Sequence, residues 1–228
     1  MTMHIILPTA ERGIVWVTDT TVGMGTANNF ASVDKILYLK GKNAACSNWG
    51  NAGLLINNEL FRWLKNSHTD FSQQGEVIEL LEKFCVISTS SFRIDRSKPG
   101  SPNVILVTCL DSEPRIYYAS LGLPPVVYAV DDLICAGDED SLGRIFVEHY
   151  YDQSGRTMNE ALFLGVHAMR KAHQQKAAYI GPPNAWVCKG GEFRRLTGAE
   201  LAQCIKASEA LDKKILHVGS NFILDTTK

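Results

Sequence analysis

Residues 13–37 read GIVWVTDTTVGMGTANNFASVDKIL, and the interpretation of the whole chain starts from this stretch. Its first part, from Gly13 to Thr18, is rich in β-branched and aromatic residues and ends at Asp19. A loop with several glycines and asparagines follows, and a second apolar run opens at Lys35. The pattern predicts two strands, with a carboxylate at the end of one and a lysine at the start of the other.

Asp19 and Lys35 taken alone are most simply solvated surface charges, because most such residues are exposed. Thr2 adds a chemical meaning to the pair. If Met1 is removed, Thr2 carries both a hydroxyl and an α-amine, a group whose ordinary pKa is about 8. That amine can serve as the base for the hydroxyl, while a nearby lysine favours the neutral amine and a carboxylate holds the lysine in place. The three residues together predict a nucleophilic site.

At these residues the sequence resembles the β-type subunits of the proteasome family, which are N-terminal nucleophile hydrolases. The family has an N-terminal threonine, a strand ending in an acid, and a lysine sixteen residues beyond that acid; these positions are filled by Thr2, Asp19 and Lys35. The interval from Thr2 to Asp19 is one residue longer than usual, and we place the extra residue in the turn at 8–12. The chain looks most like the bacterial proteasome homologues of the HslV, Anbu and BPH kinds.

Three further segments carry the resemblance, which covers the chain from Thr2 to about Leu201. Residues 45–52, ACSNWGNA, look like the family's Ala-Gly-x-x-Gly-Asp-Ala segment. Residues 150–172 look like its Met-Thr-x-x-Glu-Ala helix region, and residues 192–196, EFRRL, look like its closing hairpin. The resemblance implies an α+β fold, a four-layer αββα sandwich of the N-terminal nucleophile hydrolase type.

The order of the expected elements is compatible with that sandwich. Strands alternate with pairs of helices and not with single ones, which argues against a doubly wound parallel sheet. β-rich runs predict strands at 3–7, 13–18, 35–39, 43–48, 103–110, 115–120, 125–130, 133–136, 184–188 and 193–196. Apolar residues at helical spacing predict helices at 49–65, 71–86, 137–151, 157–173 and 197–210.

Length and composition set the class of protein. The 228 residues suit one domain. We assign residues 1–210 to a single proteasome-like domain and residues 211–228 to a C-terminal extension, which would pack on its own domain or, as we prefer, reach over a neighbour. A net charge of −1 argues against nucleic acid or a membrane surface as the main partner. There is no export signal and no apolar run long enough for a membrane span, so we expect a cytoplasmic protein.

The six cysteines and six histidines show no metal-ligand spacing. No C-x-x-C pair occurs, and several cysteines lie within apolar runs. We therefore expect buried free thiols in a reducing cytoplasm in preference to disulfides or a zinc site. Neither a metal nor another cofactor is expected.

The resemblance also implies a role for each residue of the site. The Thr2 hydroxyl would attack an amide carbonyl, its amine would take the proton, Lys35 would tune the amine and Asp19 would hold Lys35. The backbone N–H of Ser47, in the place of a family glycine, would stabilise the oxyanion. Substrate would add as a strand beside Thr21, Val22 and Gly23 and beside 47–49. The pocket for the side chain before the scissile bond would be walled by Val22, Val33, Leu37, Ala45 and Trp49, although Trp49 is equally well explained as a core residue of its helix.

The predicted function is a threonine peptidase subunit of the proteasome type. It would cleave peptides or unfolded proteins inside a chamber of homo-oligomeric stacked rings, with an ATPase unfoldase as a candidate partner. Two alternatives stay open at this point. The chain could be a catalytically inactive or latent ring subunit with the same fold, or an amide hydrolase of the same superfamily that acts on a small molecule.

Overall fold

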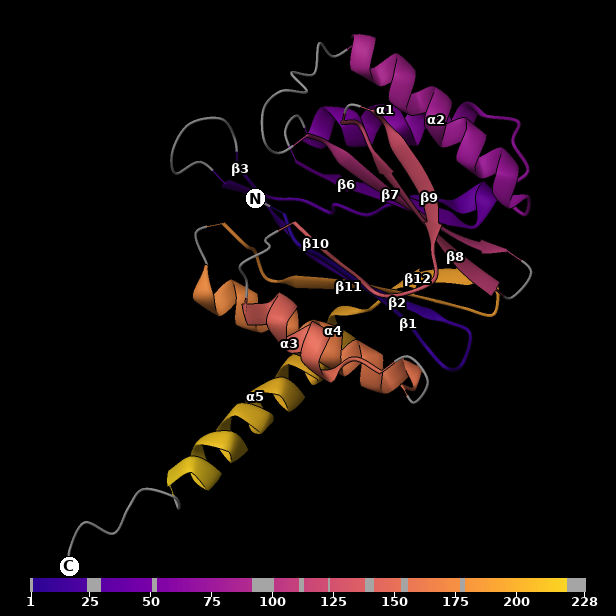
Figure 1. The fold of residues 1–228 in the computed structure, drawn as a ribbon. Helices are drawn as coiled ribbons and strands as arrows, with labels where there is room; N and C mark the ends of the chain where they lie inside the picture. Colours follow the sequence, from indigo (N-terminus) through magenta and orange to yellow (C-terminus); the bar gives the residue numbers. More distant parts are fainter. Residues whose placement is uncertain are drawn as a thin grey trace, which may run out of the picture.

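The computed structural model of the chain describes residues 2–23, 30–50, 53–91, 101–110, 113–122, 124–137, 142–152, 156–176 and 179–220. Expectations for Met1, for 51–52, for the loop at 92–100, for the helix start at 138–140 and for the tail at 221–228 lie outside the described residues. Two five-stranded antiparallel sheets pack face to face, with α1 and α2 over one and α3 and α4 over the other (Figure 1). The expected αββα sandwich is confirmed.

The first sheet holds the start of the chain in an interior position. Its strand order is β10-β1-β2-β11-β12. Within it, β1 pairs His4 with Thr18 of β2 on one side and with Ala136 of β10 on the other. The N-terminal strand is therefore held by hydrogen bonds on both edges. The strands are β1 (His4–Pro8), β2 (Ile14–Asp19), β10 (Ile134–Ala136), β11 (Pro183–Lys189) and β12 (Glu192–Arg195).

The second sheet has the order β5-β6-β7-β8-β9. A separate two-stranded pair, β3 (Thr21–Gly23) with β4 (Phe30–Ser32), and the short 3-10 helix η1 (Lys40–Lys42) were not predicted, because three residues carry too little pattern to detect. The strands of the second sheet are β5 (Leu37–Leu39), β6 (Ala44–Trp49), β7 (Asn103–Leu110), β8 (Glu113–Ser120) and β9 (Val126–Val130).

The helices occur where helical spacing predicts them, with changed ends. They are α1 (Gly53–Asn66), α2 (Gln74–Ser91), α3 (Leu142–Tyr150), α4 (Met158–Gln175) and α5 (Gly198–Ser220). Trp49 belongs to β6 and not to α1, because strand pairing with β7 continues through it. A capping box opens α4: the Thr157 side chain accepts from the Glu160 amide, and the Glu160 carboxylate accepts from the Thr157 amide.

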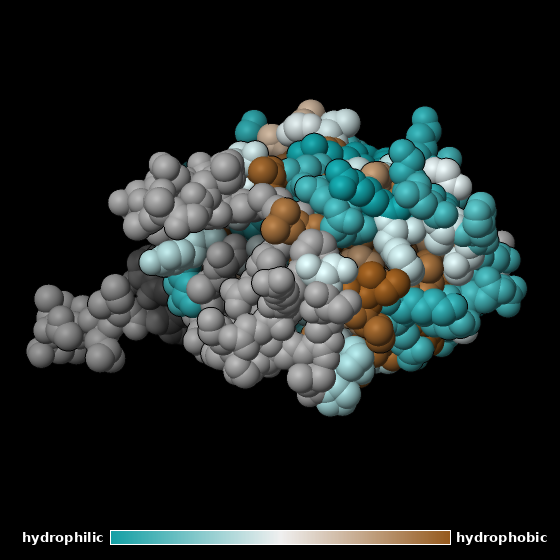
Figure 2. All heavy atoms as spheres, turned by 90° about the horizontal axis from the view of Figure 1, so that it is seen from above, coloured by the Kyte–Doolittle hydropathy of each residue, from teal (hydrophilic) through white to brown (hydrophobic). Residues whose placement is uncertain are grey.

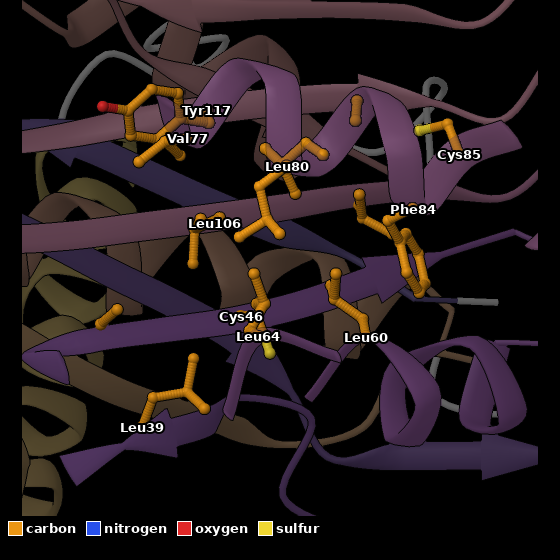
Figure 3. Packing of buried hydrophobic residues seen from close by; sticks show 14 of the residues in the cluster. Leu39, Cys46, Leu60, Leu64, Val77, Leu80, Phe84, Cys85, Leu106 and Tyr117 are labelled. Atoms are coloured by element: carbon orange, nitrogen blue, oxygen red, sulfur yellow. The ribbon is translucent and has the colours of Figure 1, made fainter. Parts of the chain in front are cut away.

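Alternate residues of the central strands separate the cores of the molecule, as the two-residue period of a strand requires. On β2, Ile14 and Trp16 point between the sheets, whereas Val15 and Val17 point toward the layer of α4. A third apolar core lies under α1 and α2 (Figure 3). Each large apolar side chain buried there contributes about 2 kcal/mol. That core includes Cys46, Leu60, Leu64, Val77, Leu80, Phe84, Leu106 and Tyr117.

Cys109 of β7 and Cys188 of β11 form a disulfide between the two sheets, with Cα atoms 6.4 Å apart. The expectation that all cysteines are free thiols is wrong for this pair. The partners are 79 residues apart and share no motif, so only the packing of the sheets brings them together. The free cysteines among the described residues are Cys46, Cys85, Cys135 and Cys204.

The helix α5 is anchored on α4 by polar contacts and then extends away from the sandwich (Figure 1). Ser208 lies 2.7 Å from His167 Nδ1 and accepts from Arg170 Nε at 2.6 Å, while Asp212 pairs with Arg170 and Lys171. Beyond Asp212 the side chain of Ile215 is 57% exposed. The helix continues unbroken past the predicted end at 210, and the division into a domain and an extension stays a prediction.

The described residues on the face that carries α1 and α2 are mostly hydrophilic, with apolar spots among them (Figure 2). The large apolar residues exposed on these two helices are Leu55, Val86 and Ile87. Among the described residues, no helix combines the length and the apolar character needed to cross a membrane.

Candidate active site

Thr2, Asp19 and Lys35 meet at one end of the sandwich. Thr2 lies two residues before the first residue of β1, Asp19 ends β2, and Lys35 lies in the connection from β4 to β5. The ammonium Nζ of Lys35 lies 2.7 Å from Asp19 Oδ1 and 3.1 Å from Thr2 Oγ1. Asp19 and Lys35 are 0% and 4% exposed, whereas Thr2 is partly exposed. The Lys35 ammonium of a buried ion pair therefore lies against the hydroxyl of a partly exposed residue.

The Asp19 carboxylate is held by four hydrogen-bond donors. Its Oδ1 accepts from Lys35 Nζ and from the Met3 amide at 2.9 Å, and its Oδ2 accepts from the amides of Thr21 and Gly181, both at 3.1 Å. An ionised carboxylate can accept this many bonds, which are charge-assisted and strong. Asp19 thus joins the start of β1, the start of β3 and the approach to β11, and it fixes the direction of Lys35.

The electrostatics of Lys35 define what it can do to Thr2. Burial lowers the pKa of Lys35, and the charge and hydrogen bond of Asp19 act in the opposite direction. An ammonium group has donors and no acceptor, so toward the Thr2 hydroxyl Lys35 donates and cannot take its proton. The arrangement leaves the role of base to another group, and the α-amine of the same threonine is the group that a free N-terminus would supply.

The main chain of Lys35 is clamped by two side chains from other elements. Its carbonyl oxygen accepts from Ser47 Oγ at 2.7 Å and from Asn57 Nδ2 at 3.0 Å. Ser47 is 0% exposed and belongs to β6, and Asn57 belongs to α1. The side chain of Ser47 is therefore joined to the site through Lys35, and its backbone N–H stays a predicted oxyanion donor.

Two glycines that the sequence analysis did not assign to the site are required by its close packing. Gly137 has a φ of +111°, and a β-carbon on it would overlap the Thr2 carbonyl. A β-carbon on Gly181 would overlap the backbone N and hydroxyl of Thr21. Gly137 was expected to open a helix, but it follows β10, which places it beside the start of β1. Recognising either glycine needs the sheet order, which local sequence does not reveal.

The residues predicted to contact substrate differ in how close they lie to Asp19 and in how deeply they are buried. Thr21 of β3 donates its amide to Asp19, and the amide of Val33 donates to the Thr20 carbonyl at 2.8 Å. Ala45 is 0% exposed in the core between the sheets, so the structure does not bring it to the surface. Trp49 is partly buried, with its ring centroid 6.0 Å from that of His4 and 5.7 Å from that of Tyr118.

The other residues predicted to contact substrate are Leu37, Val22 and Gly23. Leu37 packs against the core under α1 and α2. Val22 and Gly23 lie in β3, whose backbone pairs with β4, and the side chain of Val22 is outside the described part of the structure.

Two cavities of the molecule lie away from Thr2. One of about 580 Å³ lies between α1 and α2 and is lined by Trp63 and Phe84 among others. The other, of about 310 Å³, lies by the β1–β2 turn and includes Arg12 and Glu113. Neither contains a residue of the Thr2 group, so the site is identified by its chemistry and not by cavity size. Within the described residues, no cluster of three or more His, Cys, Asp or Glu could hold a metal ion.

Comparison of the whole chain with solved structures finds the same fold in other proteins. Anbu (ancestral beta-subunit) from Yersinia bercovieri superposes with a TM-score of 0.75 at 11% sequence identity, over 98% of this chain and 99% of that one. Anbu from Hyphomicrobium sp. strain MC1 gives a TM-score of 0.70 at 13% identity, with the same coverage of both chains. The Gly-1 mutant of Anbu from that strain gives 0.68 at 15% identity.

Comparison by sequence alone finds neither a matching family profile nor a matching curated protein. The structural likeness extends over nearly the whole chain. The proteasome-like N-terminal nucleophile hydrolase fold, and the expected resemblance to the bacterial proteasome homologues at the level of the fold, are confirmed.

Proposed function

We propose that this chain is a threonine peptidase subunit of the bacterial proteasome type, with Thr2 as its nucleophile after removal of Met1. The observation that carries the proposal is the approach of Lys35 Nζ to both Thr2 Oγ1, at 3.1 Å, and Asp19 Oδ1, at 2.7 Å. Lys35 is 33 positions from Thr2 and 16 positions from Asp19 in the sequence. The three residues are the set that an N-terminal threonine nucleophile needs. A threonine without a function at the surface is not expected to contact a buried ion pair.

In the proposed reaction the Thr2 hydroxyl oxygen bonds to the substrate carbonyl carbon, and its proton passes to the Thr2 amine. The amine then gives that proton to the departing nitrogen as the amide C–N bond breaks. Water hydrolyses the resulting ester and restores the hydroxyl. Lys35 keeps the amine neutral through its charge, and Asp19 keeps Lys35 charged and directed. The Ser47 N–H is the proposed donor to the oxyanion.

The proposed substrate is an extended peptide that adds beside β3, near Val22 and Gly23, with Val33 and Trp49 as proposed walls of the pocket for its side chain. By the same proposal the chain assembles into stacked homo-oligomeric rings in the cytoplasm, and an ATPase delivers unfolded proteins to the chamber. The arm formed by α5 after Asp212 is the part of the described structure that is best placed to reach a neighbouring copy.

Intact-mass spectrometry after incubation with a peptide epoxyketone tests the nucleophile. We expect loss of Met1 and one covalent adduct, located on Thr2. Fluorogenic peptide cleavage by Thr2→Ala and Thr2→Ser then serves as a matched pair, because both variants keep a small second residue for removal of Met1. Thr2→Ser should retain activity and Thr2→Ala should lose it.

Other outcomes select the alternatives. Retained Met1 without an adduct indicates a catalytically inactive ring subunit. An adduct on a protein whose native mass is that of a monomer or dimer indicates an amide hydrolase for small molecules, since no chamber would form. Equal peptide cleavage by Thr2→Ala and wild type would remove the proposal altogether.

A further inference from the structure

His4 is a buried imidazole that the proposed reaction does not use. It is 0% exposed and lies on β1, two residues after Thr2 and two before Ile6. Ile6 points into the core between the sheets, so the strand period places His4 on the same inward side. Its ring lies 5.9 Å from that of Trp16 and 6.0 Å from that of Trp49, measured between centroids. A polar ring in this position must satisfy its hydrogen bonds internally.

The partners of His4 allow one arrangement of hydrogens. Trp16 Nε1 lies 3.3 Å from His4 Nδ1, and an indole N–H can only donate, so Nδ1 is the unprotonated acceptor. Ser47 Oγ has one hydrogen, which points to the Lys35 carbonyl, an acceptor, at 2.7 Å. Toward His4 Nε2, at 3.3 Å, the Ser47 oxygen can therefore only accept. The carbonyl of Asn48, 3.2 Å from Nε2, also accepts. His4 is consequently neutral, with its hydrogen on Nε2.

The bonds of His4 join the two sheets at the end that contains Thr2. One side of the ring is held by Trp16 of β2, in the first sheet, and the other by Ser47 and Asn48 of β6, in the second. From Ser47 the chain of bonds continues to the carbonyl of Lys35. Lys35 itself lies in 33–36, between β4 and β5, where no strand pairing sets its position. Asp19 directs the ammonium group of Lys35, and the position of the Lys35 backbone sets how far that group can reach toward Thr2.

We propose that His4 and Ser47 are positioning residues that hold Lys35 at the Thr2 hydroxyl through the hydrogen-bond chain Trp16–His4–Ser47–Lys35. The inference rests on the proposed function, because it assigns the chain a purpose in keeping the Thr2 amine neutral. It adds a residue of the first strand and the hydroxyl of Ser47 to the machinery. Ser47 then acts through its side chain on Lys35, separately from any role of its backbone.

The surroundings of His4 favour the required neutral form. Burial is the largest cause that lowers the pKa of His4, to about 4, followed by the positive charge of Lys35, while Asn48 and Asp19 act in the opposite direction. Protonation would place a second N–H on Nδ1, directly facing the Trp16 N–H, so that two donors would oppose each other. The contact with Trp16 therefore holds only while His4 is uncharged.

The first test measures the hydrogens directly and needs no activity. Nitrogen-15 spectra of the full chain labelled at histidine, recorded at pH 7, should show His4 with a pyrrole-type Nε2 and a pyridine-type Nδ1. His4→Phe identifies the signals by their loss. An imidazolium or the opposite tautomer at this pH would overturn the proposal.

The second test is kinetic and uses a matched control. His4→Phe and Ser47→Ala should each lower kcat on a peptide substrate by about tenfold, as expected for a reactant shifted by a fraction of an ångström. Because Lys35 would lie farther from the amine, whose pKa it lowers, the acidic limb of kcat/KM should move to higher pH. The double variant should be little worse than either single variant, because both act along one path. His4→Gln, which restores an N–H donor, should recover part of the loss.

The pair His167 and Ser208 supplies the control, because it is another buried imidazole bonded to a serine hydroxyl, located between α4 and α5. His167→Phe and Ser208→Ala should lower thermal stability and leave the pH profile unchanged. A purely structural role for His4 would make its variants behave in the same way, and that result would overturn the proposal. If the proposed function itself is wrong, Thr2→Ala will be as active as wild type. If only the inference about His4 is wrong, Thr2→Ala will be inactive and His4→Phe will have the kinetics of wild type.

Discussion

Gly137 lies directly against the carbonyl group of Thr2, in a backbone conformation with φ of +111°. The contact arises because β10 pairs with β1, with Ala136 opposite His4, so that Gly137 lies beside the peptide group between Thr2 and Met3. Gly137→Ala would add a β-carbon into the Thr2 carbonyl and strain the backbone as well. We expect it to displace the nucleophile and lower kcat by about a hundredfold, since catalysis is sensitive to shifts near 1 Å. Peptide cleavage measures the effect.

The control for that variant is Gly75→Ala in α2, where an added β-carbon contacts nothing within 4 Å. Gly75→Ala should keep full activity and gain a little stability, because alanine is the better helix former by about 1 kcal/mol. Normal kinetics of Gly137→Ala would contradict the prediction, because the residues before β1 would then accommodate the added β-carbon without displacing Thr2.

The ion pair of Asp19 and Lys35 should matter for stability as well as for chemistry. Lys35→Met leaves the Asp19 carboxylate buried without its charged partner, which costs about 3 to 5 kcal/mol of unfolding free energy. The double variant Asp19→Asn with Lys35→Met removes both charges and should recover much of that loss, although it stays inactive. Urea unfolding of the two variants measures the difference. A loss below 1 kcal/mol for Lys35→Met would mean that water reaches Asp19 readily.

The main features of the fold could be predicted from sequence for a physical reason. Strand and helix periods are local and can be read from neighbouring residues, and Thr2 and Asp19 are brought together by the pairing of β1 with β2. The ends of α1 and α5 were wrong, since Trp49 is kept in β6 by pairing with β7 and the residues after 210 continue the helical pattern without a proline or other early stop.

The unpredicted parts of the site depend on contacts between distant segments. Nothing next to His4 in the sequence indicates a bond to Ser47, 43 residues away, and Gly181 reaches Asp19 across 162 residues. Cys109 and Cys188 likewise meet only because two sheets face each other. Composition and spacing carry no information about such pairs.

Acid should destabilise the protein through His4 in a defined pH window. Its pKa is about 4 when folded and 6.5 when unfolded, so below 6.5 the unfolded state binds more protons. The stabilisation by neutral His4 is complete above pH 6.5 and is lost as the pH falls toward 4. Between pH 7 and pH 5 the unfolding free energy falls by about 2 kcal/mol through His4. Urea unfolding at both values should show a smaller decline for His4→Phe than for wild type, and equal declines would contradict the assignment.

Reduction of the bond between Cys109 and Cys188 should weaken the fold without abolishing it. Closure of a loop with a separation of 79 residues is worth about 4 kcal/mol in the chain-entropy account, although measured values are often lower. The paired variant Cys109→Ser with Cys188→Ser should therefore unfold at lower urea, and reductant should no longer affect it. A thiol assay on the unfolded wild type should find four thiols before reduction and six after it. Six thiols in the unreduced protein would show that the bond is not formed.

The distal part of α5 should serve assembly and not folding. Ser208 and Asp212 anchor the helix on α4, whereas Lys213 and Lys214 are exposed. Removal of residues 213–228 should leave the unfolding temperature within a few degrees of wild type and reduce the native mass measured by light scattering. An unchanged mass would assign the arm another role, and Asp212→Ala, which releases the anchor, serves as the comparison.

The disulfide and the His4 contacts close the sandwich at its two ends. Cys188 pairs with Ile14 at the start of β2, while Asp19 stands at the other end of that strand, about 17 Å away for five residues. With the far end covalently shut, any opening of one sheet from the other pivots there and is widest at the N-terminus. On the side of Thr2 the two sheets are then held together by the apolar core between them and by His4, whose Nε2 bonds to Ser47 and Asn48 of β6.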